Sequence, residues 1–520
     1  MKNRLLAGLI FPAMVLTGCN QRVEQTPLEK PQEIKPEQVK TEQHSAGINW
    51  YQGSVDQAFA EAQATGKPLF LYWGAVWCPP CNVLKATVFQ EPEFIDTTNQ
   101  FVSVYLDGDT ERAQQYGDQF AIAGYPTVLL FNPGGEEVTR IPGGTPPEDY
   151  RQLLELVLKS DQTVADSMNA VLRGDTISSE QWHQLAWYAW DQDSGKVLEA
   201  RDPLVTFEQL ASACPDDLQA DATRLKLLAM LEWLKNPLGS GQQYIDALHR
   251  VINDEAMSRA NLSLLTSLSS EQLRALTAGD GQERFKLLVN LVARLQRMGD
   301  PELLSATERL SLVSAKIAIE KANDPHTPLP EVLIDEVRAA VAEEDKRATT
   351  HYQRQSVISS ASYLLDDAGL EDESTALLMA EVEKSEAPYY FMSMLSYRAM
   401  KKGDYENGMN WSRKAWDSAV GAATRSQWGT NHLLNLIKGA PVNIELIDGA
   451  QHQLLEEMAT AKSSVFGRTR GRMIRLNTAL EAWAEGKPER QGVWRQFQTT
   501  LKSICDAQNA DCSFLHSKEA

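Results

Sequence analysis

The sequence predicts an α/β domain in the N-terminal third of the chain and a large all-α region after it. Two observations carry this prediction. The apolar, strand-like run KPLFLYW at residues 67–73 leads into a helix-like segment that starts with two cysteines. From about Asp161 onward the pattern is helix after helix, interrupted by Gly, Pro, Asn and Asp, with no strand signal. With 520 residues, of which 43% are hydrophobic, the chain can bury several cores, so two or three domains are expected.

The first residues have the pattern of a signal peptide. Lys2 and Arg4 precede an apolar run of about a dozen residues, which is too short to span a bilayer. The run ends in Leu-Thr-Gly-Cys, which resembles the lipobox of bacterial lipoproteins. The resemblance implies that residues 1–19 are a lipoprotein signal peptide and that Cys19 is the lipidated residue. An ordinary signal peptide with a chance cysteine is the alternative.

The composition of residues 20–46 predicts a disordered tether. The segment is rich in Gln, Glu, Lys and Pro and has no aromatic residue, so it cannot bury enough apolar surface to offset the entropy of ordering. The lipobox resemblance implies a location in the periplasm of a Gram-negative bacterium, with the lipid as the only contact with a membrane. Asn20, directly after the cysteine, favours the outer membrane.

Charge and histidine usage exclude several classes of partner. The formal net charge of −20 and the pI of about 5.0 disfavour nucleic acid or an anionic membrane surface. The eight histidines form no HExxH motif and no paired Cys/His spacing, so we expect neither a metal site nor a cofactor.

The pair Cys78 and Cys81 in the stretch WCPPC is the strongest chemical signal. One CxxC pair lacks the second pair that a four-cysteine zinc site needs. A purely structural disulfide is the other alternative. The strand-like run before the pair and the helix-like run CNVLKATVF after it favour a redox dithiol, because they put the first sulfur at a helix N-terminus. There the helix dipole and free N–H groups stabilise a thiolate.

Residues 67–160 resemble a thioredoxin-fold domain, and most closely the periplasmic reductase domains of the DsbD type and related lipoprotein thioredoxins. WCPPC is followed by the motif Gly124-Tyr-Pro-Thr127, then by a strand at residues 128–131, a turn, another strand and a helix from Pro146 to Lys159. A capping box, Ser54-Val-Asp-Gln57, opens a helix upstream. We therefore expect a thioredoxin-like domain over residues 47–160.

The resemblance also implies roles for individual residues. Cys78 would be the nucleophile that attacks a substrate disulfide, and Cys81 would resolve the mixed disulfide. Pro126 would be a cis proline beside the dithiol. The residues expected to bind substrate are Trp77, Tyr125, Pro126 and Thr127, although core packing is the alternative for the tryptophan and the tyrosine.

One position departs from the family pattern. Thioredoxins usually carry a buried Asp six residues before the first cysteine, where it accepts the proton of the second. Tyr72 occupies that position here. The departure puts the speed of the resolving step in doubt but leaves the redox assignment in place.

The all-α region, residues 161–520, contains a faint internal repeat. Tyr363-x5-Gly369 and Tyr397-x5-Gly403 are offset by 34 residues, the tetratricopeptide period. This weak resemblance predicts tetratricopeptide-like helix pairs around residues 355–425, whose stacked helices would bind a partner. An irregular helical domain with chance similarity is the alternative.

Cys505 and Cys512 are candidates for a structural disulfide. On a continuous helix they would lie about 10 Å apart, which is too far for a bond. Because residues 506–511 are rich in turn formers, we expect the helix to end there and the pair to close.

These features predict a lipid-anchored periplasmic thiol–disulfide oxidoreductase, a reductase or isomerase of protein disulfides. Its partners would be protein disulfide substrates and a membrane or periplasmic thiol that donates electrons, with the helical region binding partners. The alternative is a helical scaffold or chaperone-like lipoprotein whose thioredoxin module serves mainly as a binding element.

Overall fold

The computed structural model describes residues 47–516, apart from Trp77, Ala123, Ser194, Gly279, residues 299–303, Thr327 and residues 462–464. The predicted signal peptide, the tether and the candidate lipidation site Cys19 therefore lie outside the described residues, as does Trp77.

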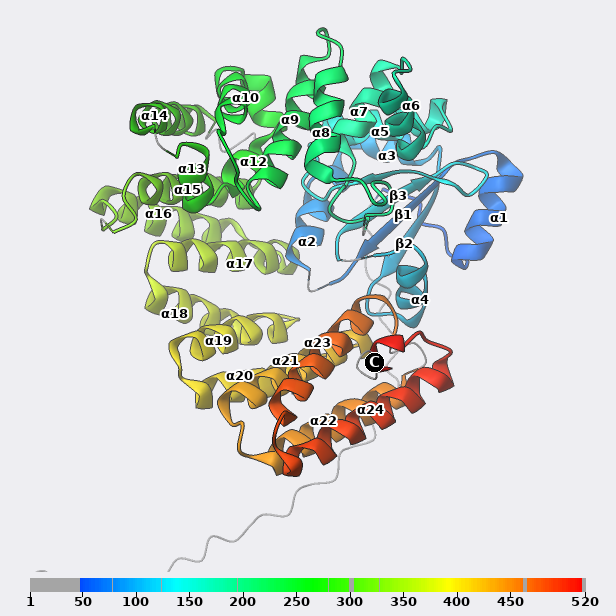
Figure 1. Cartoon of the computed structure of the whole chain (residues 1–520), viewed down its shortest axis with the longest axis vertical. Helices are drawn as coiled ribbons and strands as arrows, with labels where there is room; N and C mark the ends of the chain where they lie inside the picture. The colour runs from blue at the N-terminus through cyan, green and yellow to red at the C-terminus, as the bar shows by residue number, and fades with distance from the viewer. Residues whose placement is uncertain are drawn as a thin grey trace, which may run out of the picture. The chain divides into compact units, whose positions relative to one another are not determined.

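The N-terminal part is an α/β domain built on one four-stranded sheet (Figure 1). The strand order is β2-β1-β3-β4, with β1 parallel to β2 and antiparallel to β3, and β4 antiparallel to β3. The elements, in chain order, are α1 (Val55–Thr65), β1 (Leu69–Gly74), α2 (Pro79–Ala86), η1 (Val88–Gln90), α3 (Pro92–Thr98), β2 (Val102–Asp107), α4 (Glu111–Gln119), β3 (Thr127–Phe131), β4 (Glu137–Ile141) and α5 (Pro147–Lys159). This is the predicted thioredoxin-type α/β fold, which the structure confirms.

The central strand β1 is buried on both faces, which is why its sequence reads as a continuous apolar run. Leu69, Leu71 and Trp73 pack in one cluster with α1 and α4. Phe70 and Tyr72 point to the other face and pack with aromatic residues of η1, α3 and α5. Strand alternation thus gives the sheet two helical layers.

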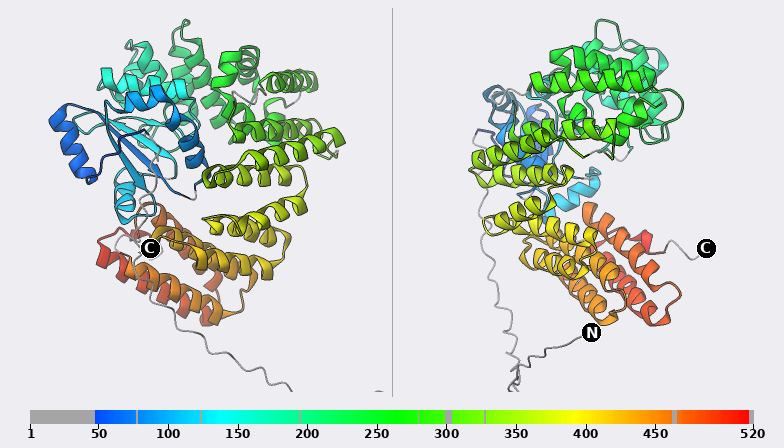
Figure 2. Two further views of the ribbon diagram at one scale, coloured as in Figure 1. Left: turned by 180° about the vertical axis from the view of Figure 1, so that it is seen from behind. Right: turned by 90° about the vertical axis from the view of Figure 1, so that its left-hand side faces the viewer.

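The rest of the described chain is helical, as predicted. Successive helices pack against one another, and Figure 2 shows those from α14 to α20 as a stacked series, coloured green to yellow. The helices are α6 (Val164–Arg173), α7 (Ser179–Trp187), α8 (Pro203–Ala213), α9 (Gln219–Trp233), α10 (Gln242–Asn253), α11 (Glu255–Ala260), α12 (Leu262–Ser267), α13 (Ser270–Leu276), α14 (Gly281–Arg297), α15 (Ala306–Asn323), α16 (Glu331–Arg347), α17 (His351–Asp367), α18 (Glu371–Val382), α19 (Pro388–Lys402), α20 (Tyr405–Ser418), α21 (Ala422–Gly439), α22 (Ile444–Thr460), α23 (Gly467–Ala484), α24 (Pro488–Gln508) and η2 (Ser513–His516).

Several helix pairs share one ion-pair pattern. The fourth residue of α15, α17 and α21 is an arginine, and each of these arginines binds a glutamate on the helix that follows. The pairs are Arg309–Glu344, Arg354–Glu381 and Arg425–Glu457. Their guanidinium groups also bind main-chain carbonyls that precede their own helix. Gly369 and Gly403, the two glycines of the expected 34-residue repeat, both lie at the end of a helix with positive φ (79° and 80°). The tetratricopeptide-like arrangement of residues 355–425 stays a prediction.

The hydrophobic core of the α/β domain continues into the helical region. The cluster that contains Phe70 and Leu130 of the sheet also contains Trp182 and Leu185 of α7 and Leu225 of α9. Hydrogen bonds reinforce this packing, because the Gln184 side chain donates to the carbonyl of Val138 and the Ala189 amide donates to the carbonyl of Arg140. Residues 184–189 therefore cover strand β4, which is an edge of the sheet.

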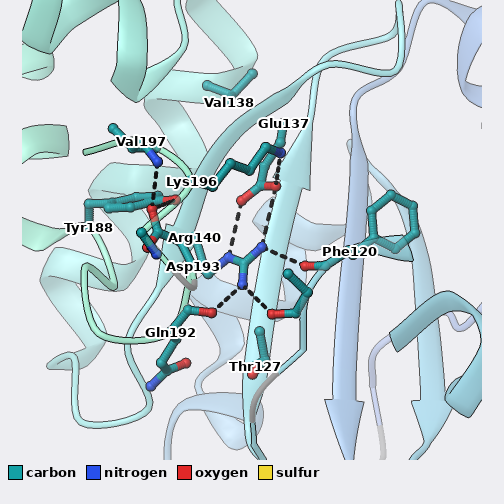
Figure 3. Close-up of polar contacts among 12 residues, drawn as sticks. Phe120, Thr127, Glu137, Val138, Arg140, Tyr188, Gln192, Asp193, Lys196 and Val197 are labelled. Carbon is teal, nitrogen blue, oxygen red and sulfur yellow. Dashed lines mark hydrogen bonds and ion pairs between the residues drawn. The ribbon is translucent and has the colours of Figure 1, made fainter. Parts of the chain in front are cut away.

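Arg140, on β4, is at the centre of this contact (Figure 3). Its side chain is fully buried, and its Nε lies 3.1 Å from the Glu137 carboxylate. Its other nitrogens donate to the carbonyls of Phe120 (2.8 Å), Ala121 (3.2 Å) and Gln192. One guanidinium thus joins strand β4, the segment after α4 and the loop after α7.

We expect Arg140→Met to lower the free energy of unfolding by about 3 kcal/mol, because the buried Glu137 carboxylate would keep only Lys196 as a cation and three main-chain carbonyls would lose their donor. Urea denaturation of the full chain, followed by circular dichroism, measures the effect. The matched control is Arg151→Met, whose partly exposed ion pairs within α5 should contribute less than about 1 kcal/mol. Equal losses in the two variants would contradict the role given to Arg140.

Candidate redox site

The candidate redox pair lies at the start of α2, directly after the buried strand β1. Cys78 is the N-cap residue, and Pro79 and Pro80 fill the first two helical positions, where a missing N–H breaks no helical bond. The Sγ atoms of Cys78 and Cys81 are bonded, with their Cα atoms 5.3 Å apart. The Cys81 amide donates to the Cys78 Sγ at 3.2 Å. The structure is therefore that of the oxidised pair.

A cis peptide bond joins Tyr125 and Pro126. The Tyr125 hydroxyl donates to the Gly108 carbonyl at 3.2 Å and accepts from the Gln114 side chain at 3.1 Å. Burial raises the pKa of Tyr125 to about 12, so the hydroxyl stays protonated. The Thr127 hydroxyl donates to the Gly124 carbonyl at 2.8 Å and is buried. The loop before β3 is thus held by its own side chains.

Tyr72, at the position where the family usually has a carboxylate, is buried in the sheet. Its ring stacks on Tyr105 and meets Phe89 edge-on, with centroids 5.4 and 4.9 Å away. The position is therefore part of an aromatic cluster rather than a proton acceptor of the usual kind.

The disulfide is covered by the helical region. Cys78 is only 2% exposed and Cys81 is fully buried. Both belong to a hydrophobic cluster that contains Ala387 and Tyr389, at the start of α19. The helix α17 packs against α2, the helix that contains Cys81.

Two carboxylates of the α/β domain bind the first turns of helices from the far end of the chain. Asp109 accepts from the Thr424 hydroxyl at the start of α21. Asp118 accepts from the Gly467 amide at 3.1 Å and pairs with Arg470 at 2.9 Å, at the start of α23. A helix N-terminus attracts negative charge, so both carboxylates stabilise these contacts. We call Asp109 and Asp118, with these partners, the docking contacts.

Arg470 occupies the same helical position as the arginines of the ion pairs described above. It is the fourth residue of α23, the position at which Arg309, Arg354 and Arg425 bind a glutamate within the helical region. In α23 the arginine instead binds a carboxylate of the α/β domain.

The remaining described cysteines form a second disulfide and one free thiol. Cys505 and Cys512 are bonded, with Cα atoms 6.2 Å apart, because α24 ends at Gln508 and the chain turns back through Asn509. Cys214 is a buried free thiol whose pKa burial raises to about 12, which leaves it as the unreactive thiol.

Sequence reasoning brought together Cys78, Cys81, Tyr125 and Pro126, but it missed the helices that cover them. Asp109 and Asp118 lie in or next to a loop of an acidic chain and carry no motif. The available signal was the arginine at the fourth position of α15, α17, α21 and α23, which recurs at irregular spacing along the chain.

Comparison with known proteins agrees with this geometry. Residues 55–158 match the thioredoxin-like domain family. Over 85 residues the chain is 34% identical to the thiol:disulfide interchange protein DsbD 1 of Pseudomonas aeruginosa, a match that covers 16% of this chain and 14% of that protein. The chain thus spans about a seventh of the length of that relative.

Small thioredoxins are matched over most of their length. The chain is 30% identical to thioredoxin 1 of Nostoc sp. over 88 residues, which are 17% of this chain and 78% of that protein. It is 32% identical to thioredoxin H4-1 of rice over 108 residues, 21% of this chain and 74% of that protein. Through this segment, which contains the Cys78–Cys81 disulfide and the cis Pro126, the chain belongs to the thioredoxin-like family.

Proposed function

We propose that the chain is a thiol–disulfide oxidoreductase that reduces or isomerises protein disulfides through Cys78 and Cys81. The observation that carries the proposal is a closed Cys-x-x-Cys disulfide at a helix N-terminus, inside a thioredoxin-like domain. Trp77, Tyr125, Pro126 and Thr127 are the proposed substrate-binding residues. The cis Pro126 and the position of Tyr125 next to it support this assignment for the loop before β3.

The proposed reaction starts from the reduced pair. The Cys78 thiolate attacks one sulfur of a substrate disulfide, a mixed disulfide forms, and the second substrate sulfur leaves as a thiolate and takes up a proton. The Cys81 thiol then loses its proton and its sulfur attacks the Cys78 Sγ, which releases the first substrate sulfur as a thiolate. The substrate gains two electrons and the protein ends with the Cys78–Cys81 disulfide. A thiol donor in the same compartment would reduce it again.

The surroundings of Cys78 favour the reducing direction. Two of the three amides that could donate to its thiolate belong to prolines and have no N–H, so only the Cys81 amide remains. Fewer donors stabilise the thiolate less, and a less stable thiolate makes the reduced form less favoured. This reasoning supports a reductase or isomerase rather than a strong oxidase.

Localisation and domain boundaries are part of the proposal. A lipid anchor at Cys19, a tether over residues 20–46, a redox domain over 47–160 and a partner-binding region over 161–520 fit the sequence pattern. No helix among the described residues is long and apolar enough to cross a bilayer. We propose that the lipid is the membrane contact, in the periplasm and at the outer membrane. The packing across residue 160 means that the redox domain and α6–α9 share a core.

The scaffold function remains the second candidate, and the burial of the disulfide is the observation that favours it. A redox enzyme of this structure must move the helices that cover Cys78 before a protein substrate can reach the sulfur. The docking contacts are polar, so water can replace them when the helices move, and the apolar cluster that contains Cys78, Ala387 and Tyr389 must open as well.

We expect the wild-type chain to accelerate the reduction of insulin by dithiothreitol, and Cys78→Ser to abolish the acceleration, because the variant lacks the attacking sulfur. Turbidity of the released insulin B chain measures the rate. Cys214→Ser is the matched control and should retain the wild-type rate, since this thiol is buried and unreactive. Equal rates for wild type and Cys78→Ser would support the scaffold function instead.

We expect the reduction potential of the Cys78–Cys81 couple to be on the order of −200 mV or lower, because only one backbone N–H supports the thiolate. Equilibration with glutathione buffers, followed by mass spectrometry of the peptide that contains both cysteines, measures it. A value near −120 mV, as in strong oxidases, would contradict the reducing direction.

We expect Asp118→Ala to increase the alkylation rate of reduced Cys78 by about tenfold or more, because it removes charge-assisted contacts to Gly467 and Arg470. Iodoacetamide labelling, quantified at the Cys78 peptide, measures the rate. Asp96→Asn, at an exposed position of α3, is the control and should change nothing. An unchanged rate in Asp118→Ala would show that these contacts do not limit access.

A further inference from the structure

One face of α23 carries a row of three arginines. Arg468, Arg472 and Arg475 are spaced by four and three residues, so they lie on the same side of the helix and span about 10 Å. The helix packs against α21, and two side-chain hydrogen bonds, four residues apart on each helix, join the two helices. Arg468 binds the side-chain oxygen of Gln427, and Arg472 binds that of Asn431 at 3.3 Å.

The acceptors in these two hydrogen bonds are neutral amides, whereas other arginines of the helical region bind carboxylates. Arg309, Arg354 and Arg425, in the same helical region, each bind a glutamate. Among the described residues, Arg472 and Arg475 have no carboxylate partner. They are therefore a local excess of positive charge in a chain whose net charge is −20.

Arg472 carries this charge in the least favourable surroundings. Its Nε is buried and has no hydrogen-bond partner among the described residues. Burial lowers the pKa of Arg472 to about 10, and the like charges of Arg468 and Arg475 lower it further in the same direction. A half-buried guanidinium with an unsatisfied N–H lowers the stability of the fold, and a bound anion would offset this loss.

The row begins at the redox site. The guanidinium of Arg468 lies 5.3 Å from the centre of the Tyr125 ring, and Tyr125 precedes the cis Pro126. Asp109 also acts on Arg468 and partly offsets its charge, whereas Arg475 is exposed to solvent. From the loop beside the disulfide, the positive row thus runs outward along α23.

We propose that Arg472, with Arg475 and Asn431, forms a subsite that binds a carboxylate of the polypeptide substrate. The inference rests on the proposed function, because the substrate is the chain whose disulfide reacts at Cys78. Guanidinium groups bind carboxylates through paired N–H donors, and the Asn431 amide can add a further donor. A nucleic acid would be repelled by the acidic chain as a whole, whereas one acidic side chain senses mainly the local row.

The test uses two fluorescent peptides that lack cysteine and are identical except that one carries three Glu where the other carries three Gln. Fluorescence anisotropy with the full chain at low ionic strength measures binding without any redox step. We expect the Glu peptide to bind about tenfold more tightly than the Gln peptide. Arg472→Gln should abolish this preference and Arg472→Lys should retain part of it. Arg495→Gln, at an exposed position of α24, should keep all of it.

Equal affinities for the two peptides, or a preference that survives in Arg472→Gln, would overturn the proposal. Thermal melts of the variants show that a lost preference does not reflect unfolding. Competition with reduced glutathione separates the two sources of carboxylate: displacement at concentrations below the dissociation constant of the Glu peptide would overturn the assignment to a polypeptide. Because insulin reduction is measured separately, a failed redox function and a failed anion subsite give different results.

Discussion

A buried guanidinium joins the sheet to everything that follows it. Arg140 satisfies the Glu137 carboxylate and three main-chain carbonyls at once, and two of those carbonyls belong to Phe120 and Ala121, on the segment that leads to the cis-proline loop. The third belongs to Gln192, beyond the first helices of the helical region. The position of the loop beside the disulfide is therefore fixed by packing that the α/β domain does not complete alone.

The same dependence holds for the edge of the sheet. In a free thioredoxin-like domain, strand β4 would expose unpaired main-chain groups, which invite other strands to pair with it. Here Gln184 and Ala189 bind that edge, and the core beneath it extends to α9. The helical region is thus continuous in its packing with the redox domain at one end. At the other end it contacts the domain through the apolar cluster around Cys78 and Cys81 and through polar contacts at Asp109 and Asp118.

How much of this the sequence could predict depends on the range of the interaction. Local signals were sufficient for the turn at Cys78, where a strand pattern, two prolines and a helix pattern stand side by side. The motif at Tyr125 and Pro126 was sufficient for the loop, through its family resemblance. The cover over the disulfide could not be predicted, since Asp118 and Arg470 are separated by most of the chain and each is an ordinary charged residue. A buried arginine such as Arg140 is likewise indistinguishable in sequence from a surface arginine, because its partners are mainly carbonyl oxygens.

The helices that cover the disulfide are synthesised long after the cysteine pair. A ribosome adds about 5–20 residues per second, and domains fold as their residues emerge. The segment that binds strand β4 follows the cysteine pair closely, whereas α21 and α23 are synthesised only near the end of the chain. A newly made molecule therefore passes through an interval in which its two thiols are formed, placed and open to any oxidant, before the last helices enclose them. During that interval the two thiols can react with molecules that the finished cover would exclude.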